Sequence, residues 1–233
     1  MKALILAGGL GTRLRSVVKD RPKPMADVKG KPFLQILIEQ LKSQGINEIV
    51  MSVGYMADKV VSYFGDGSSL GVKLEYSMED RPLGTGGAIK NAGQFLKNED
   101  RFLVMNGDTY IGADFKLMMK ESSRLNAMAY LLVKRGETYQ KAGLIELQGN
   151  RVVGIKEVEK ATGYFYAGAS VLSRNVFEHM PDSESFSFEY DLLPSLIPSG
   201  VYAQVFEGYL RDIGTVDGYL AFLEEVSYID REV

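Results

Sequence analysis

The sequence predicts an α/β fold with a doubly wound, mostly parallel, Rossmann-like sheet flanked by helices, to which an antiparallel subregion is added. Two observations support this prediction. Through the first half of the chain, short apolar runs alternate with stretches of helical periodicity, as expected when helices cross over between parallel strands. In the second half, paired apolar runs flank short turns, which is typical of hairpins.

The first half contains the alternating elements. A buried strand over residues 2–6 runs into glycines, and the first long helix starts at Pro32 and stops at Gly45. We then expect a strand over 48–53, a helix over 57–64, a strand over 72–77, a helix over about 87–96, a strand over 102–105, a helix over 115–125 and a strand over 128–133. Such connections imply helices on both faces of a parallel sheet.

The second half changes in pattern at Gly143. Strands over 144–147 and 152–155 flank a turn at residues 148–151, and further strands are expected over 164–172 and 202–206. A final helix follows Thr215, a plausible N-cap, with Asp217 in its first turn. The aromatic and methionine positions Phe33, Met118 and Phe222 are expected in the core. With 233 residues and no linker or repeat, we expect one domain.

Composition excludes several classes of function. A net charge of −3 without a long run of Lys or Arg gives no electrostatic footprint for nucleic acid or an anionic membrane. The apolar run over residues 3–7 is too short for a transmembrane helix or a signal peptide, so we expect a cytoplasmic protein. Without cysteine, disulfides and Cys-based zinc sites are excluded, and a single histidine, His179, excludes a His-rich metal site.

The loop after the first strand is suited to a polyphosphate. Gly8, Gly9 and Gly11 carry no side chain, so backbone amides can approach phosphate oxygens closely, and Arg13 adds a cationic fork. The spacing differs from the dinucleotide fingerprint, because Leu14 stands where a third glycine is needed, and from the Walker A motif. The alternative for this loop is a merely tight strand-to-helix turn.

A lysine between two prolines follows this loop. Pro22 and Pro24 stiffen the backbone, so that Lys23 can be presented in a fixed direction. The alternative is a rigid loop exposed to solvent.

Residues 6–14 followed by Pro22-Lys23-Pro24 resemble the signature of the sugar-1-phosphate nucleotidyltransferases. Later motifs match in the order of the family: residues 82–88, 106–108, 159–160 and 212–215. The closest likeness within the family is to guanylyltransferases acting on heptose 1-phosphate or mannose 1-phosphate, to which residues 82–87 and the Phe-Ser-Phe-Glu run at 186–189 are similar. The resemblance implies the nucleotide-diphospho-sugar transferase fold, with a nucleotide part over about 1–135 and a sugar part with the final helix over about 136–233.

The resemblance also implies the residues of the site. Nucleotide contacts are expected from Leu6, Ala7, Gly8, Gly9, Gly11, Thr12, Arg13, Pro82, Gly84, Thr85, Gly86, Asn106 and Gly107. Sugar contacts are expected from Gly143, Glu159, Lys160, Tyr166, Ala167, Gly168 and Glu189. In catalysis, Arg13 would stabilise the departing phosphates, Lys23 would bind phosphate near the reacting centre, and Lys160 would hold the sugar phosphate. Small residues at 84–86 would permit a close, flat approach of the base.

Two aspartates are candidate Mg²⁺ ligands. Mg²⁺ prefers oxygen ligands and commonly takes one or two carboxylates together with substrate phosphates. Asp108 and Asp212 are each expected at the carboxyl end of a strand, where they could converge on one ion, and the resemblance implies the same pair. Taken singly, either residue could instead be a turn residue or a helix cap.

The expected reaction transfers GMP from GTP to a sugar 1-phosphate, with D-glycero-α-D-manno-heptose 1-phosphate favoured by the resemblance. Tyr166-Ala167-Gly168 departs from the Asn-Ala-Gly or Asn-Gly-Gly of many relatives, so mannose or glucose 1-phosphate, and UTP, dTTP or CTP, stay open. Two other classes are a regulatory sugar-nucleotide-binding subunit and a nicotinamide-dependent oxidoreductase. The four site residues Arg13, Lys23, Asp108 and Asp212 oppose the first, and the missing third glycine opposes the second. The oligomeric state, a homo-oligomer included, is left open.

Overall fold

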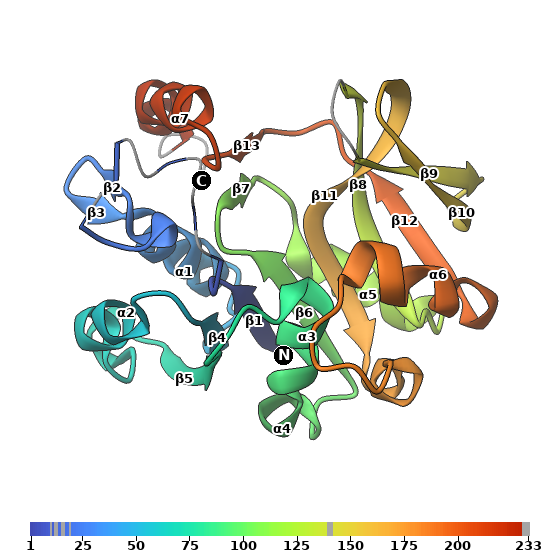
Figure 1. Cartoon of the computed structure of the whole chain (residues 1–233), viewed down its shortest axis with the longest axis horizontal. Helices are drawn as coiled ribbons and strands as arrows, with labels where there is room; N and C mark the ends of the chain where they lie inside the picture. Colours follow the sequence, from blue (N-terminus) through green and yellow to red (C-terminus); the bar gives the residue numbers. More distant parts are fainter. Residues whose placement is uncertain (10, 12–13, 15–16, 19, 139–141, 230–233) are drawn as a thin grey trace.

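The computed structural model describes residues 1–9, 11, 14, 17–18, 20–138 and 142–229. Among these residues, nine strands form one sheet in the order β5-β4-β1-β6-β11-β8-β12-β10-β9, which runs through the middle of the molecule (Figure 1). These strands are β1 (Lys2–Leu6), β4 (Glu48–Val53), β5 (Lys73–Met78), β6 (Arg101–Asn106), β8 (Ala129–Thr138), β9 (Ala142–Gln148), β10 (Arg151–Val158), β11 (Ala161–Ser173) and β12 (Val201–Val205).

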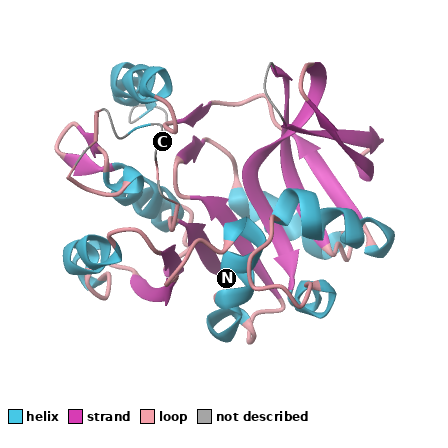
Figure 2. Ribbon diagram, in the orientation of Figure 1, coloured by secondary structure: helices cyan, strands magenta, loops and turns pink. Residues whose placement is uncertain are grey.

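Helices lie on both sides of this sheet (Figure 2). They are α1 (Phe33–Ser43), α2 (Ala57–Phe64), α3 (Gly84–Asn91), α4 (Gly93–Leu96), α5 (Phe115–Arg124), α6 (Leu193–Leu196) and α7 (Val216–Ile229). Two small ladders stand apart from the sheet: β2 (Asp27–Val28) with β3 (Lys31–Pro32), and β7 (Thr109–Ile111) with β13 (Leu210–Asp212). Short 3₁₀ turns complete the chain at Lys23–Met25, Ser68–Leu70, Arg174–His179 and Ile197–Ser199, with a π-helix at Phe188–Leu192.

Strand direction divides the sheet into two regions. From β5 to β6 each strand runs parallel to its neighbour, as the alternation of strands and helices predicts. From β11 onward the pairs are antiparallel, except that β12 runs parallel to β8. The expected hairpin at residues 148–151 joins β9 to β10, with Gln148 opposite Arg151. The predicted α/β class with an added antiparallel subregion is therefore confirmed.

Both faces of the sheet are packed with apolar side chains. Along β1, Ala3 and Ile5 belong to the cluster that packs against α1, α2, α5 and α7, whereas Leu4 belongs to the cluster that packs against α3, α4 and α6. This alternation follows from the two-residue period of a strand. Because both faces are buried, the strand has the continuous apolar sequence expected of a parallel sheet.

The first and last long helices meet across the core. The rings of Phe33 in α1 and Phe222 in α7 pack edge to face, with centroids 5.1 Å apart. Both residues and Met118 are fully buried, which confirms their expected place in the core. The helix predicted over 87–96 is corrected: it begins earlier, at Gly84, and is interrupted between Asn91 and Gly93. In the part of the chain that the structure describes, no helix has the length and apolar character needed to cross a membrane.

Candidate active site

A cavity of about 290 Å³ lies where β1, β5 and β6 end. Three segments that are far apart in the sequence form its walls, because the carboxyl ends of neighbouring parallel strands meet at one edge of a sheet. The lining residues are Leu6, Gly8, Gly9, Glu79, Pro82, Leu83, Gly84, Thr85, Ala88, Asn106 and Asp108. The structure thus gathers the first glycine loop, the start of α3 and Asp108 around one space.

The first loop is fixed at both of its described ends. At its start, the buried Ala7 donates its N–H to the carbonyl of Ser52, 2.8 Å away in β4. Further on, Gly11 has a φ of 59°, and a methyl group there would lie 2.7 Å from Cβ of Lys23. The glycine therefore lets the loop rest on the lysine stem. Leu10, Thr12 and Arg13 lie outside the described residues, so the roles expected for Thr12 and Arg13 stay predictions.

Lys23 begins a 3₁₀ turn directly after Pro22, with Pro24 at the next position. Its side chain is only 10% exposed, and its ammonium forms an ion pair with Oδ2 of Asp108. The alternative of a rigid, solvent-exposed loop is thus wrong for this side chain. The two prolines restrict the backbone, so the ammonium is directed at Asp108, which lines the cavity.

The register of a small ladder brings Asp212 to the same place. In the antiparallel pair of β7 and β13, Asp212 lies opposite Thr109, the neighbour of Asp108. The N–H of Ile213 donates to the carbonyl of Asp108 at 2.9 Å, which pins the two segments together. A methyl group at Gly214 would lie 2.8 Å from Nζ of Lys23 and 2.7 Å from Oδ1 of Asp212. The lysine ammonium and the two carboxylates therefore share one centre.

This centre has the donor set that Mg²⁺ prefers. Asp108 pairs with the Lys23 ammonium, and Oδ1 of Asp212 and Nζ of Lys23 both lie close to Gly214, so a positive charge is already accommodated beside the carboxylates. Within the described ranges, no group of three His, Cys, Asp or Glu side chains is placed to hold a metal. Two carboxylates leave coordination positions for substrate phosphates, the arrangement that Mg²⁺ commonly adopts at nucleotide sites.

The residues expected on the sugar side form a second group. A methyl group at Gly143 in β9 would lie 3.9 Å from Oε2 of Glu189 and 3.5 Å from the Tyr190 ring. The Tyr166 ring lies 5.8 Å from the Phe188 ring between centroids, and its hydroxyl donates to Oγ of Ser170 at 3.1 Å. Burial raises the pKa of the Glu189 carboxyl and that of the Tyr166 hydroxyl. Gly143, Tyr166 and Glu189 therefore lie close together in partly desolvated surroundings.

An irregularity in β11 joins this group to the nucleotide motifs. The register of β11 against β8 shifts between Tyr166 and Ser170, so Ala167 and Gly168 occupy a bulge. Gly168 has a φ of 89°, and a methyl group there would lie 3.0 Å from Nδ2 of Asn106. The next residue, Gly107, is bonded to the end of β1, because its N–H donates to the Leu6 carbonyl at 2.9 Å. The bulge thus brings the sugar-side motif against Asn106.

Glu159, Lys160 and Gly86 are among the expected residues that do not line the cavity. Glu159 and Lys160 are exposed in the turn between β10 and β11, and neither lines the nucleotide cavity. Gly86 is buried, and a methyl group there would lie 2.4 Å from the Phe186 ring. The structure therefore places Gly86 against residues 184–188 rather than along the space expected for the base.

Glu79 is a cavity residue that the motif analysis missed. It follows the end of β5, lines the cavity, and accepts a hydrogen bond from Oγ of the buried Ser52 at 2.7 Å. A methyl group at Gly8 would lie 2.2 Å from its Oε1, so the carboxylate lies directly on the first loop. The signal that could have found it is its position: it follows a parallel strand at the same sheet edge as Asp108.

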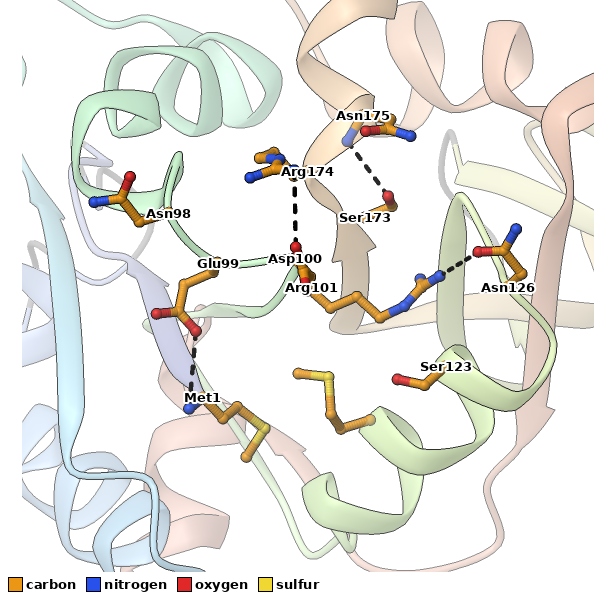
Figure 3. A pocket seen from close by; sticks show the side chains of 11 residues that line it. Met1, Asn98, Glu99, Asp100, Arg101, Ser123, Asn126, Ser173, Arg174 and Asn175 are labelled. Carbon is orange, nitrogen blue, oxygen red and sulfur yellow. Dashed lines mark hydrogen bonds and ion pairs between the residues drawn. The ribbon is translucent and has the colours of Figure 1, made fainter.

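A larger cavity, of about 700 Å³, lies at the opposite end of the sheet (Figure 3). Arg101 forms part of its wall and donates to Ser122 Oγ and Asn126 Oδ1, both at 3.0 Å, and to the Ala127 carbonyl. These bonds tie β6 to α5 and to the turn that follows α5, and they occupy the guanidinium. None of the site residues predicted from the sequence that the structure describes lines this cavity. The size of a cavity alone therefore does not identify the site.

Comparison with known proteins agrees with this geometry. The family model described as nucleotidyl transferase matches residues 2–227. A D-glycero-alpha-D-manno-heptose 1-phosphate guanylyltransferase of Campylobacter jejuni is 39% identical over 96% of the chain and 99% of the relative. A mannose-1-phosphate guanylyltransferase of Mycobacterium tuberculosis is 35% identical over 94% of the chain and 62% of the relative.

A solved structure extends the likeness to the fold. HddC from Yersinia pseudotuberculosis, crystallised in complex with GMP-PN, is 36% identical, with a TM-score of 0.81 over 97% of this chain and 99% of HddC. The match therefore covers both the parallel and the antiparallel regions of the sheet.

Proposed function

The chain belongs to the nucleotidyl transferase family and is a sugar-1-phosphate nucleotidyltransferase, and from this premise we propose that it transfers GMP from GTP to D-glycero-α-D-manno-heptose 1-phosphate. The observation that carries the proposal is the convergence of Lys23, Asp108 and Asp212 beside a cavity walled by the first glycine loop.

The proposed reaction is an in-line displacement at the α-phosphorus of GTP. A phosphate oxygen of the sugar 1-phosphate forms the new bond, the bond to the β-phosphate oxygen breaks, and pyrophosphate leaves with the electron pair. No covalent intermediate with the enzyme is formed, so positioning and electrostatic stabilisation supply the rate enhancement.

Each charged residue has one task in this scheme. Lys23, whose ammonium is held at Asp108, donates to a phosphate oxygen at the reacting centre. Arg13 stabilises the departing phosphates, and Lys160 holds the phosphate of the sugar. Bound by Asp108 and Asp212, Mg²⁺ would supply neutralisation of the phosphate charge. Together these groups offset the negative charge that two phosphorylated substrates bring into one site.

Glu79 supports guanine as the base. A carboxylate accepts hydrogen bonds at both oxygens, and guanine offers two adjacent donors, its N1–H and its exocyclic amino group. Uracil and thymine offer one N–H between two carbonyl oxygens, so a carboxylate would face at least one acceptor. Because Glu79 lies on Gly8 and is oriented by Ser52, it is preorganised at the cavity wall.

The sugar assignment is supported by the group around Glu189. Glu189, Gly143 and Tyr166 lie together, and a partly buried carboxylate is a suitable acceptor for sugar hydroxyls. The heptose and mannose guanylyltransferases among the relatives make mannose 1-phosphate the second candidate. We assign nucleotide binding to about residues 1–135 and sugar binding to about residues 136–233, within one domain. We also propose that the reaction takes place in the cytoplasm. Either a monomer or a homo-oligomer is compatible with this scheme.

A substrate matrix tests the proposal. Pyrophosphate release is measured with each of the four nucleoside triphosphates against heptose, mannose and glucose 1-phosphates, with and without Mg²⁺. We expect release that requires both substrates and Mg²⁺ and is fastest with GTP and the heptose 1-phosphate. Faster release with UTP or dTTP would contradict the base assignment, and faster release with mannose 1-phosphate would contradict the sugar assignment.

A further inference from the structure

Residues 181–188 lie along the loop that opens α3. Figure 1 shows this segment, which precedes α6, passing beside α3. The Phe186 N–H donates to the Leu83 carbonyl at 3.0 Å, and the Phe186 carbonyl accepts from the N–H groups of Gly86 at 3.0 Å and Gly87 at 3.2 Å. The segment is thus hydrogen-bonded to the loop at the start of α3, and residues 82–85 of this loop line the nucleotide cavity.

The glycines of this loop are required by that contact. A methyl group at Gly84 would lie 2.6 Å from the Phe186 carbonyl oxygen, and one at Gly87 would lie 2.2 Å from the Glu184 carbonyl oxygen. Real Cβ atoms do not approach backbone oxygens so closely, so a side chain at either position would push the segment away. The small residues of this motif therefore serve the docking of residues 184–188.

Lys90 holds the outer end of the same segment. It lies in the last turn of α3 and is half-buried. Its Nζ donates to three consecutive carbonyl oxygens, those of Pro181 at 2.6 Å, Asp182 at 3.2 Å and Ser183 at 3.3 Å. An ammonium has three N–H donors, so all of them are directed to one stretch of backbone.

The C-terminal end of the segment is next to Glu189, the carboxylate proposed to bind the sugar. The Phe188 N–H donates to Oγ1 of Thr85 at 2.9 Å, and Thr85 lines the nucleotide cavity. The next residue is Glu189, which lies by Gly143. One continuous backbone therefore connects the anchor at Lys90, the nucleotide loop and the carboxylate proposed to bind the sugar.

We propose that Lys90 is a positioning residue for the sugar 1-phosphate: by holding residues 181–183 it seats the segment that carries Glu189 on the nucleotide loop. This inference rests on the proposed function, because it concerns the second substrate of that reaction. Lys90 itself does not line the nucleotide cavity. Its substitution therefore raises the KM for the sugar 1-phosphate and leaves nucleotide binding unchanged.

The test compares Lys90→Met with wild type. KM and kcat for the sugar 1-phosphate are measured at saturating nucleotide, and the Kd of a fluorescent analogue of that nucleotide is measured separately. Because the variant loses all three hydrogen bonds from the charged Lys90 donor, we expect the KM to rise about tenfold or more. Lys90→Arg, which keeps a cationic donor, should restore most of the loss. Lys120→Met, on an exposed position of α5, is the matched control and should behave as wild type.

A second variant, in α3, disturbs the contact between α3 and residues 184–188. Gly87→Ala favours the helix through its higher propensity but displaces the Glu184 carbonyl, so it should also raise the KM for the sugar 1-phosphate and spare the nucleotide Kd. Thermal unfolding of each variant shows whether the fold is kept. If Lys90→Met folds and keeps the wild-type KM, or if the nucleotide Kd weakens as much as the KM, the inference is wrong. The assay uses whichever nucleotide and sugar 1-phosphate wild type turns over, so a wrong substrate assignment would appear in wild type and not in this comparison.

Discussion

The catalytic centre and the sugar side of the site are held by two different kinds of backbone. At the centre, Asp212 lies opposite Thr109 in a regular antiparallel ladder, and the Ile213 N–H binds the Asp108 carbonyl. On the sugar side, Tyr166 opens a bulge and Glu189 lies in a π-helix. A regular ladder fixes positions through its register, whereas bulges and π-helices redirect individual side chains. The two carboxylates proposed to hold the metal thus lie in or beside the regular ladder, whereas Tyr166 and Glu189, proposed for the sugar side, lie in irregular backbone.

Asp108→Asn removes a charge from the catalytic centre, and we expect it to have the largest effect on kcat. By analogy with the loss of one electrostatic group from other active sites, kcat for pyrophosphate release should fall about 10²- to 10³-fold or more. The Asp108 carbonyl still accepts from Ile213, and the side-chain oxygen of asparagine can accept from the Lys23 ammonium, so the fold should be kept although loss of the ion pair lowers the thermal stability. An unchanged kcat in the folded variant would remove Asp108 from the centre.

Glu79→Gln tests the base assignment at the edge of the regular part. An amide offers one acceptor where the carboxylate offers two, so one guanine donor loses its partner. Discrimination by such hydrogen bonds amounts to about 1–3 kcal/mol, and we expect kcat/KM for GTP to fall about 10- to 100-fold while the ratio of UTP to GTP rises. The KM for the sugar 1-phosphate serves as the control. A variant with the wild-type preference for GTP would show that the base is read elsewhere.

Glu189→Gln tests the sugar side of the site through the pH dependence of the KM for the sugar 1-phosphate. Burial raises the pKa of Glu189, and Tyr166 beside it stays neutral because its own pKa is raised as well. Below its pKa the carboxyl is protonated and loses acceptor strength, so the wild-type KM for the sugar 1-phosphate should rise as the pH falls through the raised pKa of Glu189. We expect about a tenfold higher KM at pH 8 in the variant, with a flatter pH profile. A variant profile as steep as that of wild type would assign the titration to another group.

The same substitution should have a smaller effect on stability. A carboxyl whose pKa is raised by folding stabilises the folded state below its unfolded pKa, and this contribution is lost as the pH rises through the folded pKa. Glu189→Gln removes the cost of a buried charge, so its free energy of unfolding, relative to wild type, should increase from pH 4 to pH 8. Denaturant unfolding at both pH values measures this. A difference that is the same at both would show that burial does not perturb Glu189.

The regular part could largely be predicted from the sequence. The alternation of strands and helices predicted the parallel half of the sheet, and the position after a buried strand indicated Asp108 as a site residue. Asp212 was expected at a strand end, but the register that sets it opposite Thr109 depends on pairing between β7 and β13, about a hundred residues apart in the chain. Lys23 was expected to point in a fixed direction, and its partner Asp108 emerged only from the tertiary structure.

The irregular part could be predicted less well, for physical reasons. The bulge at Ala167 and Gly168 has no periodic signal, because its backbone is set by contact with Asn106. The small residues at 84–86 were interpreted through the nucleotide, whereas Gly86, like the adjacent Gly87, makes room for residues 184–188. Glu79 belongs to no glycine or proline motif, although its position after β5 was available to the same argument as Asp108.

The most direct test of the account is a double-mutant cycle on Asp108→Asn and Asp212→Asn. Mn²⁺ binding in the presence of GTP, followed by electron paramagnetic resonance, is measured together with kcat/KM for wild type, both single variants and the double variant. If the two carboxylates hold one ion, each single variant should weaken Mn²⁺ binding, and the double variant should lose far less than the sum of the two effects. Additive losses, or a single variant that binds Mn²⁺ as tightly as wild type, would contradict a shared centre.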